Sequence, residues 1–176
     1  SNIATVYEIE ELDGQLLIVM ELLEGRSLRR VLAERRLSII ETVSIARDIA
    51  RALARAHHAG VVHRDIKPEN VFITEPAPGA LLAKVLDFGL ARQSLPLEGG
   101  SERTSTDTAA GKIWRTPGYL SPEQAHAQPV DARSDVFSFG TVVYEMLAGR
   151  RAFRAENTLA ILLAVAKSEP EPLRWH

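Results

Sequence analysis

The chain of 176 residues contains no cysteine, which excludes a disulfide framework and a thiolate metal site. It also lacks a secretory signal pattern and any apolar run long enough to span a bilayer. The apolar run Thr141–Leu147 is short and contains Glu145, so we expect a buried helix there. An excess of one charge is missing too, because the net charge is only −2. We therefore expect no binding to nucleic acid and no membrane contact from this segment.

The residues that are present suit one globular domain, since 45% are apolar and 25% are charged. Ala4–Ile9 and Gln15–Glu21 have the composition of strands, and Asp13-Gly14 between them is a common hairpin pair. The second run has no polar alternation, which predicts burial on both faces. Ser27 can cap a short helix that reaches about Glu34.

The clearest helix is predicted over Ser38–His58, where apolar residues recur every three or four positions and Gly60 marks the end. Short strands are predicted at Val71–Thr74 and Ala83–Leu86. The polar, aperiodic residues 91–112 indicate a long loop. Two more helices are predicted, one from Ser134 or Asp135 to near Gly149 and one over Asn157–Lys167. Strands followed mostly by helices indicate an α+β fold.

The residues best suited to catalysis lie in the run His63-Arg64-Asp65-Ile66-Lys67-Pro68-Glu69-Asn70 and in Asp87-Phe88-Gly89. Asp65 can accept a proton from an attacking hydroxyl, and Lys67 can contact a transferring phosphate. Asn70 and Asp87 offer oxygen ligands to a hard cation, so we expect Mg²⁺, with Mn²⁺ as an alternative. One such residue alone is as well explained by a turn or a cap, but the order and spacing of the set favour phosphoryl transfer.

These motifs resemble the catalytic loop and metal-binding turn of serine/threonine protein kinases, and the resemblance covers essentially the whole chain. Val19–Gly25 resembles the hinge of that family, Thr116–Glu123 the end of its activation segment, and Asp135–Gly140 the start of its central helix. The run Ser-Pro-Glu-Gln-Ala from Ser121 is most similar to bacterial members. The resemblance implies ATP-dependent phosphorylation of Ser and Thr hydroxyls of proteins in signal transduction.

The resemblance also implies further site residues. Met20 would be the gatekeeper, and the backbones of Glu21 and Leu23 would bind adenine. Ser27 and Phe72 would complete the nucleotide site, and Thr116 would join Asp65, Lys67 and Asn70 in the catalytic set. The family's Asp at position 135 braces the backbone of the catalytic loop.

By the same resemblance, residues 1–20 are the end of the amino-terminal lobe, 21–25 the hinge and 26–176 the helical carboxyl-terminal lobe. We expect the last two strands of the amino-terminal sheet but no Gly-rich loop or strand Lys, because Lys84 lies too close to Asp87 for that role. The chain is therefore expected to be an internal fragment of a kinase domain, ending before its final helices and inactive by itself.

Arg64 implies regulation, because kinases with this Arg use it to bind a phosphate on the activation loop. Thr104, Ser105, Thr106 and Thr108 are the candidate phosphosites, and Thr106 and Thr108 are preferred. Autophosphorylation in trans within a dimer is a further expectation. The cytoplasm, or the cytoplasmic domain of a membrane-anchored kinase, is the expected location.

Two alternatives stay open at this stage. A pseudokinase that acts as a binding or scaffold module would have the same fold, although the presence of Asp65, Lys67, Asn70 and Asp87 argues against it. A small-molecule phosphotransferase of kinase-like fold would resemble this catalytic loop only loosely and would lack the run Thr116–Glu123.

Overall fold

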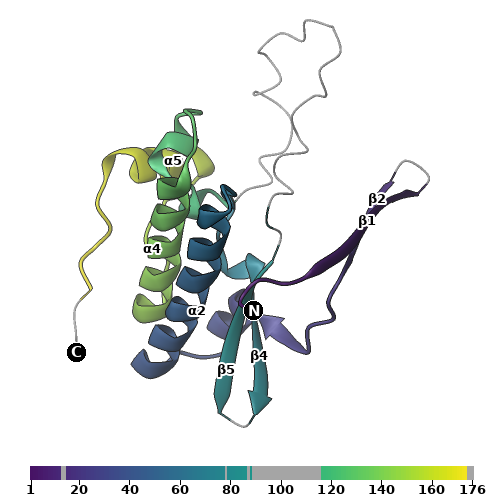
Figure 1. The fold of residues 1–176 in the computed structure, drawn as a ribbon. Coiled ribbons are helices and arrows are strands. Elements are labelled where there is room, and N and C mark those ends of the chain that lie inside the picture. The colour runs from purple at the N-terminus through teal and green to yellow at the C-terminus, as the bar shows by residue number, and fades with distance from the viewer. Residues whose placement is uncertain (13–14, 78, 87, 89–115, 174–176) are drawn as a thin grey trace, which may run out of the picture.

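The computed structural model describes residues 1–12, 15–77, 79–86, 88 and 116–173. It contains a two-stranded and a three-stranded antiparallel sheet, together with helices that are packed side by side (Figure 1). The strand ribbon β1–β2 projects away from the helices, whereas β4 and β5 lie beside α2 (Figure 1). This arrangement confirms the predicted α+β class. Within the described part of the chain, no helix has the length and hydropathy needed to cross a membrane.

The first sheet consists of β1 (Val6–Leu12) and β2 (Gln15–Met20), which pair from Val6 opposite Met20 to Leu12 opposite Gln15. Both strands were predicted, but the predicted burial of the second strand on both faces is wrong. Leu17 and Val19 are 41% and 46% exposed. The reason is that, among the described residues, β1 and β2 contact chiefly each other, so no helix packs on either face of the ribbon.

The second sheet has the order β3–β4–β5, with β3 at Gly25–Ser27, β4 at Val71–Ala77 and β5 at Ala80–Val85. Gly25 pairs with Thr74 at a very close approach of the two backbones. A Cβ atom at Gly25 would lie 2.2 Å from the carbonyl oxygen of Ile73, so only glycine fits there.

Local caps determine the ends of the first two helices, and of these caps Ser27 and Gly60 were predicted. The Ser27 hydroxyl accepts the Arg30 N–H at the start of α1 (Leu28–Glu34). Ser38 and Glu41 form a reciprocal capping box at the start of α2 (Ile39–His58). Gly60, just beyond the end of α2, has a φ of 73°, the left-handed conformation that was predicted for it.

The Glu41 carboxylate at the start of α2 provides a test of stability against pH. Arg35 hydrogen bonds and the Ser38 N–H together lower the pKa of Glu41 to about 2 from 4.5. A carboxylate with a depressed pKa in the folded state stabilises the fold above its unfolded pKa, and this contribution is lost as the pH falls from 4.5 to about 2. We expect Glu41→Gln to lower the unfolding free energy by about 0.5–1 kcal/mol at neutral pH, because the Arg35 pair is partly exposed and therefore screened by solvent.

Urea denaturation of both proteins across this pH range checks the prediction. Gln can still form the capping box, so the loss of unfolding free energy measures the contribution of the Glu41 charge. The difference between the two proteins should shrink steadily as the pH falls from 4.5 toward 2. A difference that stays constant with pH would contradict the role assigned to the ionised carboxylate.

The remaining helices follow the second sheet in the chain. The helix α4 (Ala132–Ala148) begins earlier than predicted, because the Asp131 carboxylate caps it by accepting the Arg133 N–H at 2.8 Å. It ends as predicted at Gly149, whose φ is 64°. The last helix, α5 (Thr158–Lys167), is capped by Asn157. The short elements η1 (Pro68–Asn70), η3 (Pro117–Tyr119) and α3 (Pro122–Ala125) were not predicted.

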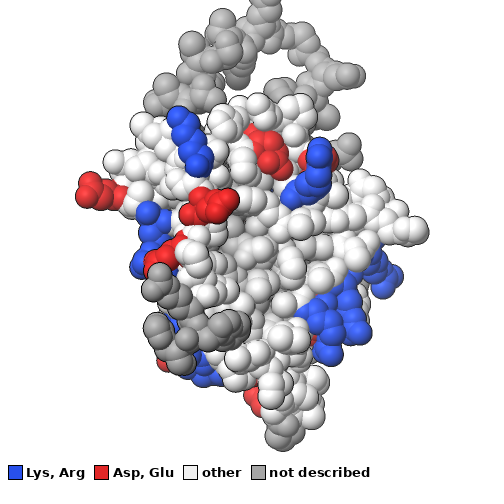
Figure 2. All heavy atoms as spheres, turned by 90° about the vertical axis from the view of Figure 1, so that its left-hand side faces the viewer, with Lys and Arg blue, Asp and Glu red and all other residues white. Residues whose placement is uncertain are grey.

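A single apolar core joins these elements. It comprises buried side chains from α1, α2, α4, β4, β5 and the loop between α2 and η1, among them Leu28, Ile45, Ile49, Ile66, Val71, Val85, Val142 and Met146. The space-filling view in Figure 2 shows the side of the molecule on which α4 and α5 lie in Figure 1. Basic and acidic side chains are interspersed there over a largely uncharged surface. The loop that carries Asp65 is thus attached to the core through Ile66.

Candidate active site

A buried carboxylate from α4 holds the backbone of the loop that follows α2. Asp135 is fully buried, and its two oxygens accept the N–H groups of His63 and Arg64, each at 2.8 Å. The His57 Nε2 atom lies 2.7 Å from Asp135 Oδ2. Hydrogen bonds to an ionised, buried acceptor are among the stronger ones in proteins. This loop is therefore fixed by a helix that lies about seventy residues further along the chain.

The imidazole of His63 connects the same loop to the segment after β5. Its Nε2 lies 2.7 Å from the carbonyl oxygen of Leu86, and its Nδ1 accepts the Asp65 N–H at 3.2 Å. Only the tautomer with the proton on Nε2 satisfies both contacts. The Phe88 ring packs on the edge of this imidazole, with 4.7 Å between ring centroids. His63 thus positions the backbone of Asp65.

The three polar residues Asp65, Lys67 and Asn70 come together at one carboxylate oxygen. Asp65 Oδ2 accepts hydrogen bonds from Lys67 Nζ at 2.7 Å and from Asn70 Nδ2 at 3.1 Å. Asn70 Nδ2 also donates to the Asp65 carbonyl at 2.9 Å, which fixes the orientation of the amide. Its Oδ1 has no hydrogen-bond partner among the described residues, so this atom is available to a hard cation.

Ser27 and Phe72 lie across from each other, and both are next to the expected hinge. Ser27 pairs with Phe72, and Phe72 pairs with Lys84 on its other side. Residues opposite each other in antiparallel strands share one face of the sheet. The Lys84 ammonium also forms an ion pair with Glu21, and this hydrogen bond lowers the pKa of the Glu21 carboxyl. The ion pair therefore places Glu21 near the face of the sheet that carries Ser27 and Phe72.

The backbone after β2 has unused hydrogen-bonding groups at the expected adenine position. The Glu21 N–H donates to the carbonyl of Thr5 at 2.9 Å. Within the described part of the chain, the Glu21 carbonyl and both backbone groups of Leu23 make no hydrogen bond. Met20 is half-buried at the end of β2. An acceptor and a donor two residues apart suit the polar edge of a purine base.

Two of the predicted site residues are not joined to this group. Thr116 is half-buried before η3, and among the described contacts none links its side chain to Asp65 or Lys67. Asp87 lies outside the described residues, so its pairing with Asn70 at a metal ion stays a prediction. The candidate phosphosites Thr104, Ser105, Thr106 and Thr108 also lie outside the described residues.

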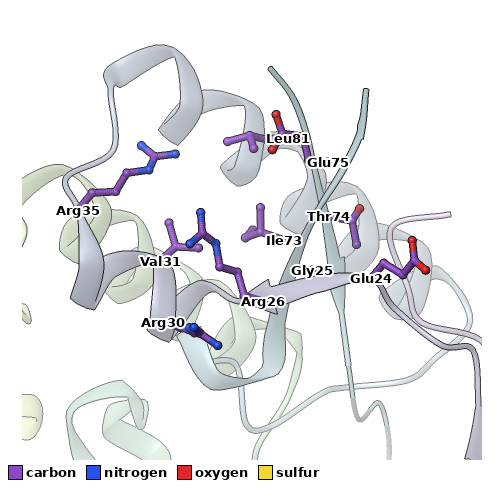
Figure 3. A pocket seen from close by; sticks show the side chains of 10 residues that line it. All are labelled: Glu24, Gly25, Arg26, Arg30, Val31, Arg35, Ile73, Thr74, Glu75 and Leu81. Atoms are coloured by element: carbon purple, nitrogen blue, oxygen red, sulfur yellow. The ribbon is translucent and has the colours of Figure 1, made fainter. Parts of the chain in front are cut away.

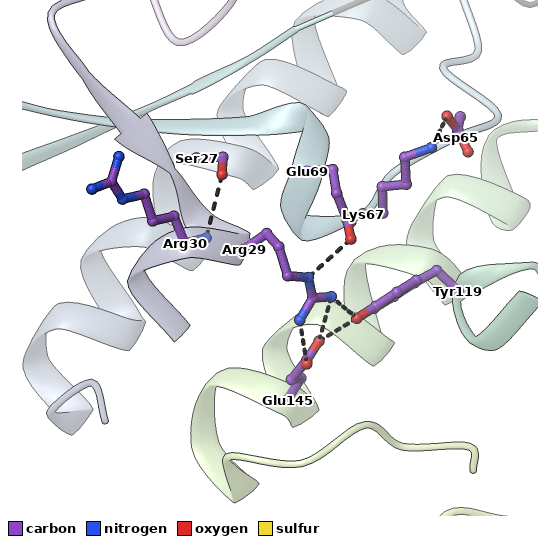
Figure 4. Close-up of polar contacts among 8 residues, drawn as sticks. All are labelled: Ser27, Arg29, Arg30, Asp65, Lys67, Glu69, Tyr119 and Glu145. Carbon is purple, nitrogen blue, oxygen red and sulfur yellow. Dashed lines mark hydrogen bonds and ion pairs between the residues drawn. The ribbon is translucent and has the colours of Figure 1, made fainter. Parts of the chain in front are cut away.

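An arginine that the sequence reasoning missed links α1 to this site (Figure 4). Arg29 Nε binds Glu69 at 2.9 Å, and Nη1 binds Glu145 of α4 at 2.8 Å. The hydroxyl of Tyr119 donates to Glu145 and accepts from Arg29. Since Glu69 precedes Asn70, this cluster supports η1 from the side opposite Asp65. We call Arg29, Glu69, Tyr119 and Glu145 the arginine cluster.

The surroundings of Arg29 and Tyr119 keep both side chains in their ordinary protonation states. Burial acts to lower the pKa of Arg29, but the hydrogen bonds to Glu145 and Glu69 outweigh it and raise that pKa. Burial raises the pKa of the Tyr119 phenol, and the adjacent Glu145 carboxylate raises it further. Tyr119 therefore stays a neutral donor to Glu145 at neutral pH.

Arg64 has an unusual backbone conformation directly before Asp65. Its φ is 69°, in the left-handed region, which costs a residue with a side chain about 1–2 kcal/mol. Such a conformation persists only where the surrounding contacts determine it. Arg64 Nε is buried and has no hydrogen-bond partner among the described residues. A buried guanidinium donor of this kind can bind an anion.

A separate pocket of about 390 Å³ lies between α1, β3, β4 and β5 (Figure 3). Its floor contains Val31 and Ile73, and three arginines line it. Each of these arginines is paired with a carboxylate. Arg26 and Arg30 both bind Glu34, and Arg35 binds Glu41. The pocket contains none of Asp65, Lys67 and Asn70, so it is not part of the candidate active site.

Comparison with known proteins agrees with this geometry. The family model described as protein kinase domain matches residues 1–171. The chain is 36% identical over 177 residues to the probable serine/threonine-protein kinase PknB of Corynebacterium glutamicum, covering 98% of this chain. It is 37% identical over 171 residues to the serine/threonine-protein kinase pkn2 of Myxococcus xanthus and 41% identical over 145 residues to PknL of Mycobacterium tuberculosis, covering 97% and 82% of this chain.

The chain spans only part of these relatives, namely 26% of PknB, 20% of pkn2 and 33% of PknL. The match to the family nevertheless extends over nearly the whole chain and includes every element of the site described above. These relatives are bacterial kinases, as the run Ser-Pro-Glu-Gln-Ala had indicated. The chain belongs to the protein kinase domain family.

Proposed function

We propose that the protein transfers the γ-phosphate of ATP to Ser and Thr hydroxyl groups of proteins. The observation that carries this proposal is the arrangement of Lys67 Nζ and Asn70 Nδ2 around one oxygen of Asp65. Phosphoryl transfer depends mainly on positioning and on charge stabilisation. The carboxylate, the ammonium group and the amide supply the positioning and the charge. The buried Asp135 of α4 holds the loop that carries Asp65.

The roles follow from the atoms that each side chain presents. Asp65 is partly exposed and orients the attacking hydroxyl, whose proton it accepts. Lys67, only 2.7 Å from Asp65, can turn to the transferring phosphate. Asn70 Oδ1 would hold a divalent metal ion together with Asp87. A metal ion bound there would supply neutralisation of the phosphate charge. Thr116 is proposed to support the catalytic loop from the activation segment.

The nucleotide is proposed to lie between β2 and β4. The Glu21 carbonyl and the Leu23 backbone would bind the adenine edge beside Met20. Phe72 would contact one face of the base from β4, and Ser27 would lie near the ribose. The unused backbone groups of residues 21 and 23 support this placement.

Regulation by a loop phosphate is proposed on the basis of Arg64. Its buried Nε has no partner in the part of the chain that the structure describes, so a phosphate on Thr106 or Thr108 would gain a charge-assisted hydrogen bond there. We propose that this phosphate is added by a second copy of the protein, in the cytoplasm where ATP is available. The protein substrates are defined only by their Ser or Thr hydroxyl.

The test uses the full-length protein that the gene encodes, with Mg²⁺ and γ-labelled ATP and with dephosphorylated casein as substrate. We expect label on casein and on the protein itself, found as phosphoserine and phosphothreonine, and its loss when EDTA removes the metal. Mass spectrometry then locates the loop phosphate. A folded protein that binds ATP in calorimetry but transfers no label would overturn the proposal in favour of a binding module.

A further inference from the structure

We propose that Gln124 is a positioning residue for Asp65, because its side-chain amide holds the Arg64 carbonyl and so fixes the peptide that precedes the catalytic carboxylate. Gln124 Nε2 donates to this carbonyl oxygen at 2.7 Å. The contact joins α3 to the catalytic loop across sixty residues of sequence. This inference rests on the kinase function proposed above.

The orientation of the Gln124 amide is fixed by its second contact. Gln124 Oε1 accepts the Ser121 N–H at 3.0 Å, and the Gln124 N–H donates to Ser121 Oγ at 3.4 Å. These two bonds form the capping box at the start of α3, and Ser121 is completely buried. With Oε1 committed to an N–H, the amide NH₂ must point to the Arg64 carbonyl, where an acceptor is present.

The capping box alone does not explain why Gln occupies this position. Glu closes a capping box as well as Gln does, and Glu41 has this role at the start of α2. A carboxylate at position 124 would instead direct an oxygen toward the Arg64 carbonyl oxygen. The donor of the amide is therefore the feature that the catalytic loop requires.

The Arg64–Asp65 peptide is then held on both sides. Asp135 accepts the Arg64 N–H, Gln124 binds the Arg64 carbonyl, and His63 Nδ1 accepts the Asp65 N–H. Together these contacts account for the left-handed φ of 69° at Arg64. Of these contacts, the one from Gln124 comes from α3, which begins within the run Thr116–Glu123. Gln124 thus makes the position of Asp65 depend on that segment.

The experiment compares Gln124→Glu with Gln128→Glu, which introduces the same charge at an exposed position four residues away. In the full-length protein we expect Gln124→Glu to lower kcat by about tenfold, since small misplacements of a reacting group are costly. The KM values for ATP and casein should change less than about twofold, because no binding contact is lost. Gln128→Glu should match the unchanged protein.

A second readout does not depend on activity. The NMR shift of the Arg64 carbonyl carbon should move in Gln124→Glu and return when the pH falls below about 4, because the protonated carboxyl group regains a donor. A shift that never moves, or a kcat equal to that of Gln128→Glu in an active protein, would overturn the proposal. If neither protein transfers phosphate, the kinase function fails, and the carbonyl shift still decides whether Gln124 holds Arg64.

Discussion

Replacing Asp65 by Asn in the full-length protein is expected to lower kcat by about 10²–10⁴ and to leave the fold intact. The loss has this size because a positioned general base contributes that much to catalysis. The fold should persist because the Asn carbonyl oxygen can still accept from Lys67 Nζ and from Asn70 Nδ2, as Asp65 Oδ2 does. The variant loses the ability to accept the hydroxyl proton and retains the local hydrogen bonds.

The matched control is Asp131→Asn. Asp131 is exposed at the start of α4, where it caps the helix, and Asn is as good a cap as Asp. Label transfer from ATP to casein, measured at saturating substrate, should be unchanged in this control. The melting temperatures of the two variants should agree within about 2 °C, which is the effect of less than about 1 kcal/mol in a domain of this size. An Asp65→Asn protein that keeps more than about a tenth of wild-type turnover would exclude Asp65 as the base.

Most helix ends, the start of α4 excepted, could be predicted from the sequence because their causes are local. Ser27, Ser38 and Asn157 each accept an N–H from a residue three positions further on. Gly60 and Gly149 adopt the left-handed conformation that ends a helix. Such signals need no knowledge of the tertiary structure, since the cap and its partner lie within one turn.

The strands were predicted less well because their environment is set by distant partners. Val19 is exposed because β1 and β2 contact chiefly each other and no helix covers them, which an uninterrupted apolar run cannot reveal. The strand β4 continues through Pro76 to Ala77, three residues beyond its predicted end. Its hairpin partner β5 also begins earlier than predicted, at Ala80. The pairing of Ala77 with Ala80 explains both extensions.

In the candidate site, too, the contacts that are local in sequence were predicted and the long-range contacts were not. Asp65, Lys67 and Asn70 lie within six residues, so their spacing alone indicated that they meet. The contact of His57 Nε2 with Asp135 spans 78 residues of sequence. Arg29 has partners 40, 90 and 116 residues away. No periodicity or local motif carries information about contacts of that range.

Replacing Arg29 by Met is expected to lower the unfolding free energy by about 2–3 kcal/mol, the largest loss of stability that we predict. Glu145 is only 8% exposed on its side chain, and Arg29 Nη1 binds it at 2.8 Å. Removal of one partner from a buried ion pair leaves an uncompensated charge, which costs about 3–5 kcal/mol. The Arg29 side chain is 27% exposed, so we expect a loss of about 2–3 kcal/mol, smaller than for a fully buried pair.

Arg30→Met is the matched control, because Arg30 is the next residue of α1 and its side chain is 70% exposed. Its pair with Glu34 four residues on should contribute only about 0.3–0.5 kcal/mol. Both variants are compared with the unchanged chain by urea denaturation at neutral pH, where the difference in midpoint gives the difference in stability if the slope is unchanged.

The double variant Arg29→Met, Glu145→Gln separates a lost attraction from a buried charge. Gln removes the uncompensated charge and still offers Tyr119 an oxygen acceptor, so the double variant should regain at least about 1 kcal/mol over Arg29→Met alone. If the two substitutions instead add, the cost of Arg29→Met lies in its packing against the Tyr119 ring, whose centroid is 5.7 Å from the guanidinium carbon. Recovery would establish that Arg29 of α1 stabilises the fold by balancing the buried charge of Glu145 in α4.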